Sequence, residues 1–72
     1  MLPLSLAEPM VPQSIAKITG KDEVRRHLAE LGLVLGEEVK VVSTLGGNVI
    51  LQVKDSRIAL DRELANRIMV RG

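Results

Sequence analysis

The chain has 72 residues and a formal net charge of +1, with 46% hydrophobic and 26% charged residues and neither cysteine nor an aromatic side chain. This length allows one small domain, residues 1–72, that buries only about 60% of the unfolded chain's surface and is too small to enclose a large active-site cleft. The missing cysteines exclude disulfides and thiolate-built zinc sites, and the missing aromatic side chains remove base stacking and aromatic-lined peptide grooves as binding modes.

Charges of opposite sign are interleaved along the chain, as in Lys21-Asp22-Glu23 and Asp61-Arg62-Glu63. A nucleic-acid-binding domain carries a basic excess gathered on one face, so we expect no nucleic-acid partner. The apolar residues 1–10 lack a basic start and are broken by Pro3 and Pro9, which argues against a secretion signal. No apolar run approaches the ~18 residues of a membrane helix. These features predict a soluble, cytoplasmic protein.

The first predicted element is a short strand. Pro9 and Pro12 hold the backbone in extended or turning conformations and keep residues 10–13 out of a helix. Residues 14–18, Ser-Ile-Ala-Lys-Ile, are typical of a strand, and Thr19-Gly20 ends it.

A helix of about ten residues is expected to follow from Lys21. Val24, Leu28 and Leu31 are spaced i, i+4 and i+7, so they share one stripe of a helix and are expected in the core. Charged side chains occupy the opposite face, where they can pair at i, i+4. Gly32 stands where a left-handed residue would end the helix.

The apolar period changes from 3.6 to 2 after Gly36, which indicates strands. The pair Gly46-Gly47 separates two such runs and suits the tight turn of a β-hairpin, because both glycines can adopt positive φ. Residues 54–56 form a second turn, and Asp61 is placed to cap a short helix over residues 61–66. The predicted strands cover residues 38–41, 49–53, 57–60 and 68–70, with Val39, Val41, Leu51 and Val53 in the core.

These elements predict a mainly β fold of about five short strands with one α-helix inserted after the first strand. Strands this short do not make a stable open sheet. Curling into a small barrel removes exposed edges and encloses the aliphatic side chains, so we expect a small β-barrel.

The order of residues in this pattern resembles a known family. Residues 28–42, Leu-Ala-Glu-Leu-Gly-Leu-Val-Leu-Gly-Glu-Glu-Val-Lys-Val-Val, are similar to the segment L-x-x-L-G-L-x-P-G-x-x-V-x-V-V of the FeoA family. Residues 57–60, then 63–65 and Ile68, resemble that family's closing hairpin, helical turn and last strand. Gly46-Gly47-Asn48 stands where the family usually has G-D-P, and the likeness covers nearly the whole chain.

The resemblance implies an SH3-like barrel, in agreement with the strands expected from periodicity. It also implies a small cytoplasmic protein of bacterial ferrous-iron uptake that works with FeoB, a membrane transporter with a GTP-binding domain. Association with the membrane would then be indirect. The same barrel occurs as the C-terminal domain of iron-dependent repressors of the diphtheria-toxin type. No helix-turn-helix precedes the barrel here, so a complete repressor is not expected.

Several residues differ from the family's usual pattern. Leu35 stands in place of a proline, and His27 in place of a basic residue. Asp55-Ser56 replaces a glycine and an aromatic residue in the second turn, and Asp61 replaces a basic residue. If a partner reads those positions, the binding surface of this chain is altered.

The expected binding surface follows the helix. Leu33, Val34 and Leu35 are consecutive aliphatic residues, and a turn or strand buries only some of them. Two interpretations stay open, because these residues can form an interface or can cap the core. Arg25 and Arg26 would stand at the rim of the interface. The predicted partner-binding residues are therefore Arg25, Arg26, Leu33, Val34 and Leu35.

Catalysis and metal binding have less support. Each serine would need the single histidine, His27, as its base, and no glycine-rich phosphate loop is present, so we expect no enzyme and no catalytic residue. Glu23, His27 and Glu30 line one side of the helix and are the candidate ligands of a divalent metal. One helix cannot easily wrap a metal ion, so we expect neither a metal site nor a cofactor.

The sequence thus predicts a non-enzymatic cytoplasmic accessory protein of ferrous iron uptake that binds and modulates a FeoB-type transporter through an aliphatic and basic surface. The alternative is a metal-binding sensor or metallochaperone domain, related to the repressor barrels, that uses Glu23, His27 and Glu30. Weak self-association is left open.

Overall fold

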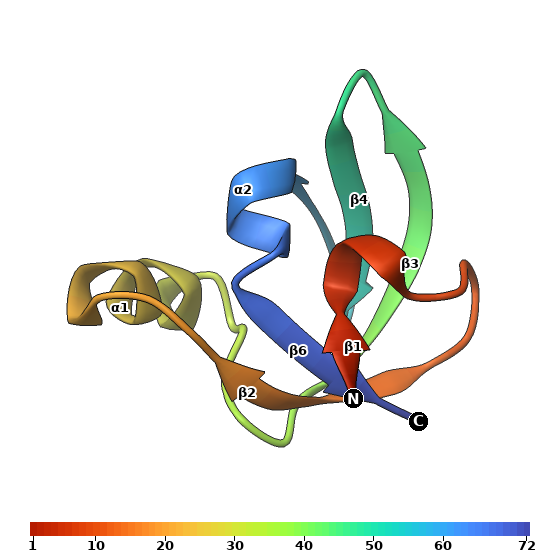
Figure 1. Cartoon of the computed structure of the whole chain (residues 1–72). Helices are drawn as coiled ribbons and strands as arrows, with labels where there is room; N and C mark the ends of the chain where they lie inside the picture. The colour runs from red at the N-terminus through yellow and green to blue at the C-terminus, as the bar shows by residue number, and fades with distance from the viewer.

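Six antiparallel strands form one curled sheet in the order β1-β6-β2-β3-β4-β5 in the computed structural model, which describes residues 1–72 (Figure 1). Helix α1 stands beside β2, and the short helix α2 lies on the other side of β6, nearer β4 (Figure 1). Neither helix has the length and apolar character needed to cross a membrane. The elements are β1 (Leu2–Pro3), a 3-10 turn (Leu4–Leu6), β2 (Gln13–Ile18), α1 (Asp22–Glu30), β3 (Glu38–Leu45), β4 (Asn48–Val53), β5 (Ser56–Asp61), α2 (Arg62–Ala65) and β6 (Ile68–Arg71).

The mainly β fold, the five expected strands and both helices are confirmed, whereas β1 was not predicted. It is two residues long and pairs with β6, where Leu2 lies opposite Val70, so the two ends of the chain meet (Figure 1). The 3-10 turn that follows buries Leu4 to 1% exposure. The start of the chain therefore completes one edge of the sheet and fills part of the core.

The core consists of hydrophobic side chains alone, and no polar or charged residue is among the buried ones. Leu28 is buried as predicted, whereas Val24 and Leu31 are half-buried and pack against the core from the same helix stripe. The 14 core residues are Leu4, Ala7, Ile15, Leu28, Leu33, Val39, Val41, Val49, Leu51, Val53, Leu60, Ala65, Ile68 and Val70.

Both predicted hairpin turns are present and each has two residues. Gly46 and Gly47 have φ of +59° and +88° and join β3 to β4, with Leu45 opposite Asn48. In the second turn Lys54 has a φ of +53°, although it is not a glycine. Two-residue hairpin turns with positive φ match the right-handed twist of the strands. These turns fix the register of β3, β4 and β5.

One residue of the predicted interface belongs to the core instead. At the end of α1 the N–H of Gly32 donates to the carbonyl oxygen of Ala29 at 2.9 Å, and the N–H of Leu33 donates to that of Leu28 at 2.9 Å. With a φ of +89° at Gly32, this is a Schellman motif, in which the residue after the glycine packs back onto the helix. Leu33 and Leu28 are both fully buried as a result. The prediction that Leu33 contacts a partner is therefore wrong.

The short helix α2 begins as predicted at Asp61, whose Oδ1 atom accepts a hydrogen bond from the N–H of Leu64 at 2.8 Å. This cap satisfies one of the free N–H groups at the start of a helix and contributes about 1 kcal/mol. Ala65 follows at the end of the helix and is fully buried. The cap therefore holds a four-residue helix in place over the core.

Two leucines separated by a single residue should differ greatly in their response to the same substitution. Leu33→Ala leaves a cavity in the core and should lower the free energy of unfolding by about 2–5 kcal/mol. Leu35→Ala removes an exposed side chain and should change that free energy by less than about 0.5 kcal/mol. Urea denaturation of both variants measures the difference. Equal losses would contradict the burial of Leu33.

Candidate protein-interaction surface

The exposed aliphatic residues of the predicted surface lie on a tight turn. The N–H of Glu37 donates to the carbonyl oxygen of Val34 at 3.1 Å, and Gly36 has a φ of +86°. This hydrogen bond and this angle match a type II turn, in which Leu35 takes the second position and a glycine the third. The Leu35 side chain is 66% exposed and that of Val34 is 43% exposed. The turn therefore presents two apolar side chains to solvent.

This turn is bonded to the sheet. The N–H of Gly36 donates to the carbonyl oxygen of Ile15 at 2.8 Å, and the N–H of Ile15 donates to that of Glu37 at 2.9 Å. Ile15 is a buried residue of β2. Because the turn bond ties Val34 to Glu37 and both residues after Leu35 are bonded to β2, the backbone at Leu35 has a fixed position rather than the freedom of an ordinary loop residue.

A surface cavity of about 210 Å³ lies between β2, α1 and this turn. The structure thus brings two predicted residues, Arg25 and Leu35, to the same hollow from elements that are separate in the chain. Three of the five lining residues are hydrophobic and the other two are basic. The lining residues are Ala16, Lys17, Ile18, Arg25 and Leu35.

The basic side chains of the cavity form only weak ion pairs within the chain, or none. The Nη2 atom of Arg25 lies 3.6 Å from Oδ1 of Asp22, with 56% and 89% of the two side chains exposed, and donates to the carbonyl oxygen of Gly20 at 3.4 Å. An ion pair this exposed contributes about 0–1 kcal/mol. Lys17 forms no salt bridge within the chain. Both cations are therefore able to pair with acidic groups of another molecule.

The other predicted residues, Arg26, Leu33 and Val34, do not line this cavity. Arg26 is exposed on α1 but does not line the hollow, since consecutive helix residues are turned by about 100°. Three lining residues were not predicted, and all come from β2. There the pairing with β6 shifts register between Ile15 and Lys17, a β-bulge at Ala16. A bulge re-aims the side chains next to it and leaves no clear mark in a short sequence.

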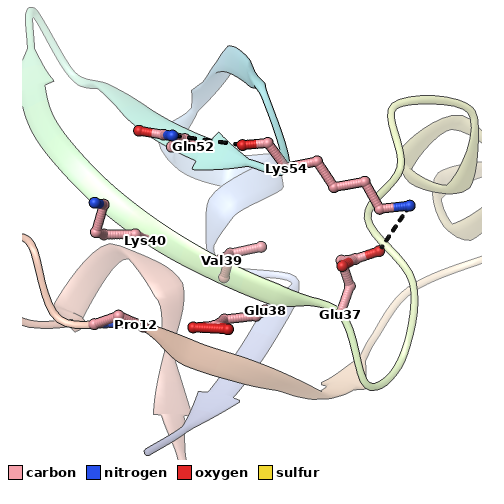
Figure 2. A pocket seen from close by; sticks show the side chains of 7 residues that line it. All are labelled: Pro12, Glu37, Glu38, Val39, Lys40, Gln52 and Lys54. Atoms are coloured by element: carbon pink, nitrogen blue, oxygen red, sulfur yellow. Dashed lines mark hydrogen bonds and ion pairs between the residues drawn. The ribbon is translucent and has the colours of Figure 1, made fainter.

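A second cavity, of about 310 Å³, lies over the start of β3 and the end of β4 (Figure 2). Its charges cancel, because Glu37 and Glu38 stand with Lys40 and Lys54, and Lys54 Nζ lies 3.6 Å from Oε1 of Glu37. The Gln52 side chain donates to the carbonyl oxygen of Lys54 at 3.4 Å (Figure 2). The lining has no imidazole or hydroxyl group, and its one hydrophobic residue is Val39. This larger hollow is therefore the weaker candidate for catalysis and for apolar docking.

The candidate metal ligands Glu23, His27 and Glu30 are all exposed on α1. No group of three or more histidine, aspartate and glutamate side chains in the chain is arranged to hold a metal ion. This geometry does not supply the metal site that the alternative function, a metal sensor, requires.

Comparison with known proteins gives consistent likenesses. The model of the FeoA domain family matches residues 2–72. Over 70 residues the chain is 34% identical to a protein of Methanocaldococcus jannaschii named as an Fe(2+) transport protein A, and the match covers 97% of this chain and 85% of that one. The crystal structure of an iron uptake regulatory protein, FeoA, has a TM-score of 0.89 and 33% identity, covering 97% of this chain and 93% of that one.

A further likeness is to the crystal structure of ScaR with bound Cd2+, with a TM-score of 0.91 and 20% identity. It covers 100% of this chain but only 36% of ScaR, so it bears on the fold alone. Together with the FeoA structure, it confirms the SH3-like barrel expected from the sequence.

The turn predicts that proline fits at position 35. No backbone hydrogen bond is donated by Leu35, and proline favours the second position of a type II turn. Leu35→Pro should raise the free energy of unfolding by about 0.4–1 kcal/mol, because it restricts the unfolded chain. The matched control is Leu33→Pro, which removes the hydrogen bond to Leu28 and should destabilise the fold. Thermal unfolding measures both, and a loss of stability in Leu35→Pro would contradict the turn assignment.

For ferrous iron we expect binding no tighter than ~1 mM, because the three candidate ligands lie on one exposed helix face. Anaerobic calorimetry on the purified protein, with His27→Ala as the control, measures this. A stoichiometric isotherm at micromolar protein that is lost in His27→Ala would show the expectation to be wrong.

Proposed function

Because the chain belongs to the FeoA family, which is associated with ferrous iron transport, we propose that it is a non-enzymatic accessory protein that binds a FeoB-type membrane transporter from the cytoplasmic side. The family supplies the context of iron transport. The choice of surface rests on this chain's own residues. We define the docking patch as Lys17, Arg25, Val34 and Leu35.

The observation that carries the proposal is Leu35, a leucine that is 66% exposed although the backbone around it is fixed. The turn bond joins Val34 to Glu37, and Gly36 and Glu37 are both bonded to Ile15 of β2. A fixed, exposed apolar side chain contributes to binding without a large cost of ordering. Burying a leucine stabilises a complex by about 1.5–3 kcal/mol. Lys17 and Arg25 beside it favour a partner whose apolar contact site carries acidic side chains at its rim.

Protein binding agrees with the chemistry available to the chain. Proline-motif recognition, the mode used by many SH3 domains, requires aromatic walls, and the chain has no aromatic residue. None of the four serines lines either cavity, and the single histidine is exposed on α1. These features support recognition through aliphatic contact and a non-enzymatic role.

Modulation of a transporter follows from unequal affinity for its states. A protein that binds two conformations equally well shifts neither, however tightly it binds. Docking by this patch would change transport only to the extent that one transporter state offers a better acidic and apolar counter-surface than the other. The direction of regulation is then set by the partner.

The test is binding of the transporter's cytosolic domain to Leu35→Ser, measured by calorimetry. Truncating a central apolar contact should weaken binding by about tenfold. The matched control is Leu45→Ser, because Leu45 is another exposed leucine, at 73%, but lies at the tip of the β3–β4 hairpin away from the patch. Arg25→Glu should weaken binding too, and more so at low salt.

The proposal depends on the contrast between the two leucines. Equal affinity of Leu35→Ser and the wild type, in a folded variant, would remove the docking patch from consideration. An equal loss in Leu45→Ser would show that the interface lies elsewhere or is not specific.

A further inference from the structure

Strand β5 is an open edge of the sheet. It pairs with β4 on one side, and no strand pairs with its other side. The opposite edge, β1, is only two residues long and contains Pro3, so it offers few groups for pairing. β5 has six residues, Ser56–Asp61, and four of them are exposed: Ser56, Arg57, Ala59 and Asp61.

The backbone groups that face away from β4 can be identified from the register. The two-residue turn closes with Val53 opposite Ser56, which makes Ser56 a hydrogen-bonded residue of the ladder. Bonded and non-bonded pairs alternate in antiparallel strands, so the N–H and C=O groups of Arg57 and Ala59 and the N–H of Asp61 point outward. The C=O of Asp61 belongs to α2 instead, because the C=O of an N-cap residue accepts the first hydrogen bond of its helix. None of the backbone hydrogen bonds formed outside regular elements involves the outward groups.

This edge lacks three of the devices that usually block strand pairing, namely proline, lysine and a β-bulge. β5 has no proline and no lysine, and its register with β4 is continuous from Asn48–Asp61 to Val53–Ser56. By contrast, the pairings of β2 with β6 and of β3 with β4 each contain a shift. A six-residue edge without bulge, proline or lysine is a template for another strand.

The sequence of β5 indicates what that strand is. Around Ala59 the order is Arg57-Ile58-Ala59-Leu60-Asp61, with opposite charges at equal distances from the centre and an aliphatic residue on each side. We propose that β5 pairs with β5 of a second copy of this chain, antiparallel and with Ala59 opposite Ala59. In this register Arg57 of each copy lies opposite Asp61 of the other, and Ile58 lies opposite Leu60.

The geometry of the ladder agrees with this register. In this register the two Ala59 residues exchange two N–H···O=C bonds, and at each end the N–H of Asp61 donates to the C=O of Arg57 in the second copy. Opposite charges directly across a strand pair stabilise it, whereas like charges destabilise it. Sliding the copies by two residues in one direction brings Asp55 opposite Asp61, and sliding them in the other direction leaves Arg57 opposite Glu63, which lies beyond β5 in α2. Centring the pair on Arg57 or on Asp61 sets like charges together. The register centred on Ala59 is therefore favoured.

Two side chains fit this arrangement in detail. Asp61 uses Oδ1 to cap α2, which leaves its second carboxylate oxygen for an arginine. Ile58 faces the core but is only half-buried, because no strand lies beyond β5. A second β5 would cover its exposed part.

The experiment is sedimentation equilibrium of the wild-type protein from about 10 μM to 1 mM, since an interface of one strand pair is small and weak. Two variants should abolish dimers: Arg57→Asp, which sets aspartates opposite each other, and Ala59→Pro, which removes an outward N–H. The control Arg71→Asp makes the same charge change on β6 and should dimerise like the wild type. Thermal unfolding verifies that each variant is folded.

Amide hydrogen exchange gives a second measurement that needs no variant. At ~1 mM protein the amides of Ala59 and Asp61 should exchange more slowly than at ~10 μM, whereas exposed amides elsewhere should not change. A monomer at every concentration would overturn the proposal. A dimer that persists in Arg57→Asp would overturn it too. If the protein is monomeric and its β5 amides become protected only when another protein is added, the edge belongs to a different partner and the proposal is wrong.

Discussion

The end of α1 is the constraint on which the rest of the site depends. Gly32 adopts a φ of +89°, and this lets the chain reverse so that Leu33 packs against Leu28 in the core. With Leu33 fixed inside, the next residues have to run along the surface, where the type II turn and its two bonds to Ile15 hold them against β2. The exposure of Leu35 is thus a consequence of the burial of Leu33.

Most of the fold could be predicted because alternation and turn residues are local signals. The spacing of Val24, Leu28 and Leu31 predicts α1, and the glycine pair 46–47 predicts the first hairpin. β1 could not be predicted in the same way, since two residues have no period and Pro3 argues against a strand. Its pairing partner β6 is at the far end of the chain, so the strand forms only through a contact distant in sequence.

The site shows the same division between local and distant signals. The burial of Leu33 could have been predicted, since a leucine after a helix-ending glycine and five residues after Leu28 is the pattern of a Schellman motif. The cavity beside Leu35 could not, because it needs a β-bulge at Ala16 and the approach of α1 to β2. The hairpin turn at Lys54 was expected from its composition, yet its positive φ falls on a residue type that rarely adopts one.

The two surfaces proposed for this protein, a barrel without aromatic residues, would bind their partners through different chemical groups. Docking through Leu35 uses side chains, and its strength comes from apolar burial beside two cations. Pairing through β5 uses the backbone, and only its register depends on the side chains of Arg57 and Asp61. In the sheet order β3 and β4 separate β2 from β5, so a second copy at the β5 edge leaves the β2 side of the sheet uncovered. A dimer would present two docking patches, and a transporter able to engage both would gain affinity through effective concentration without any new contact.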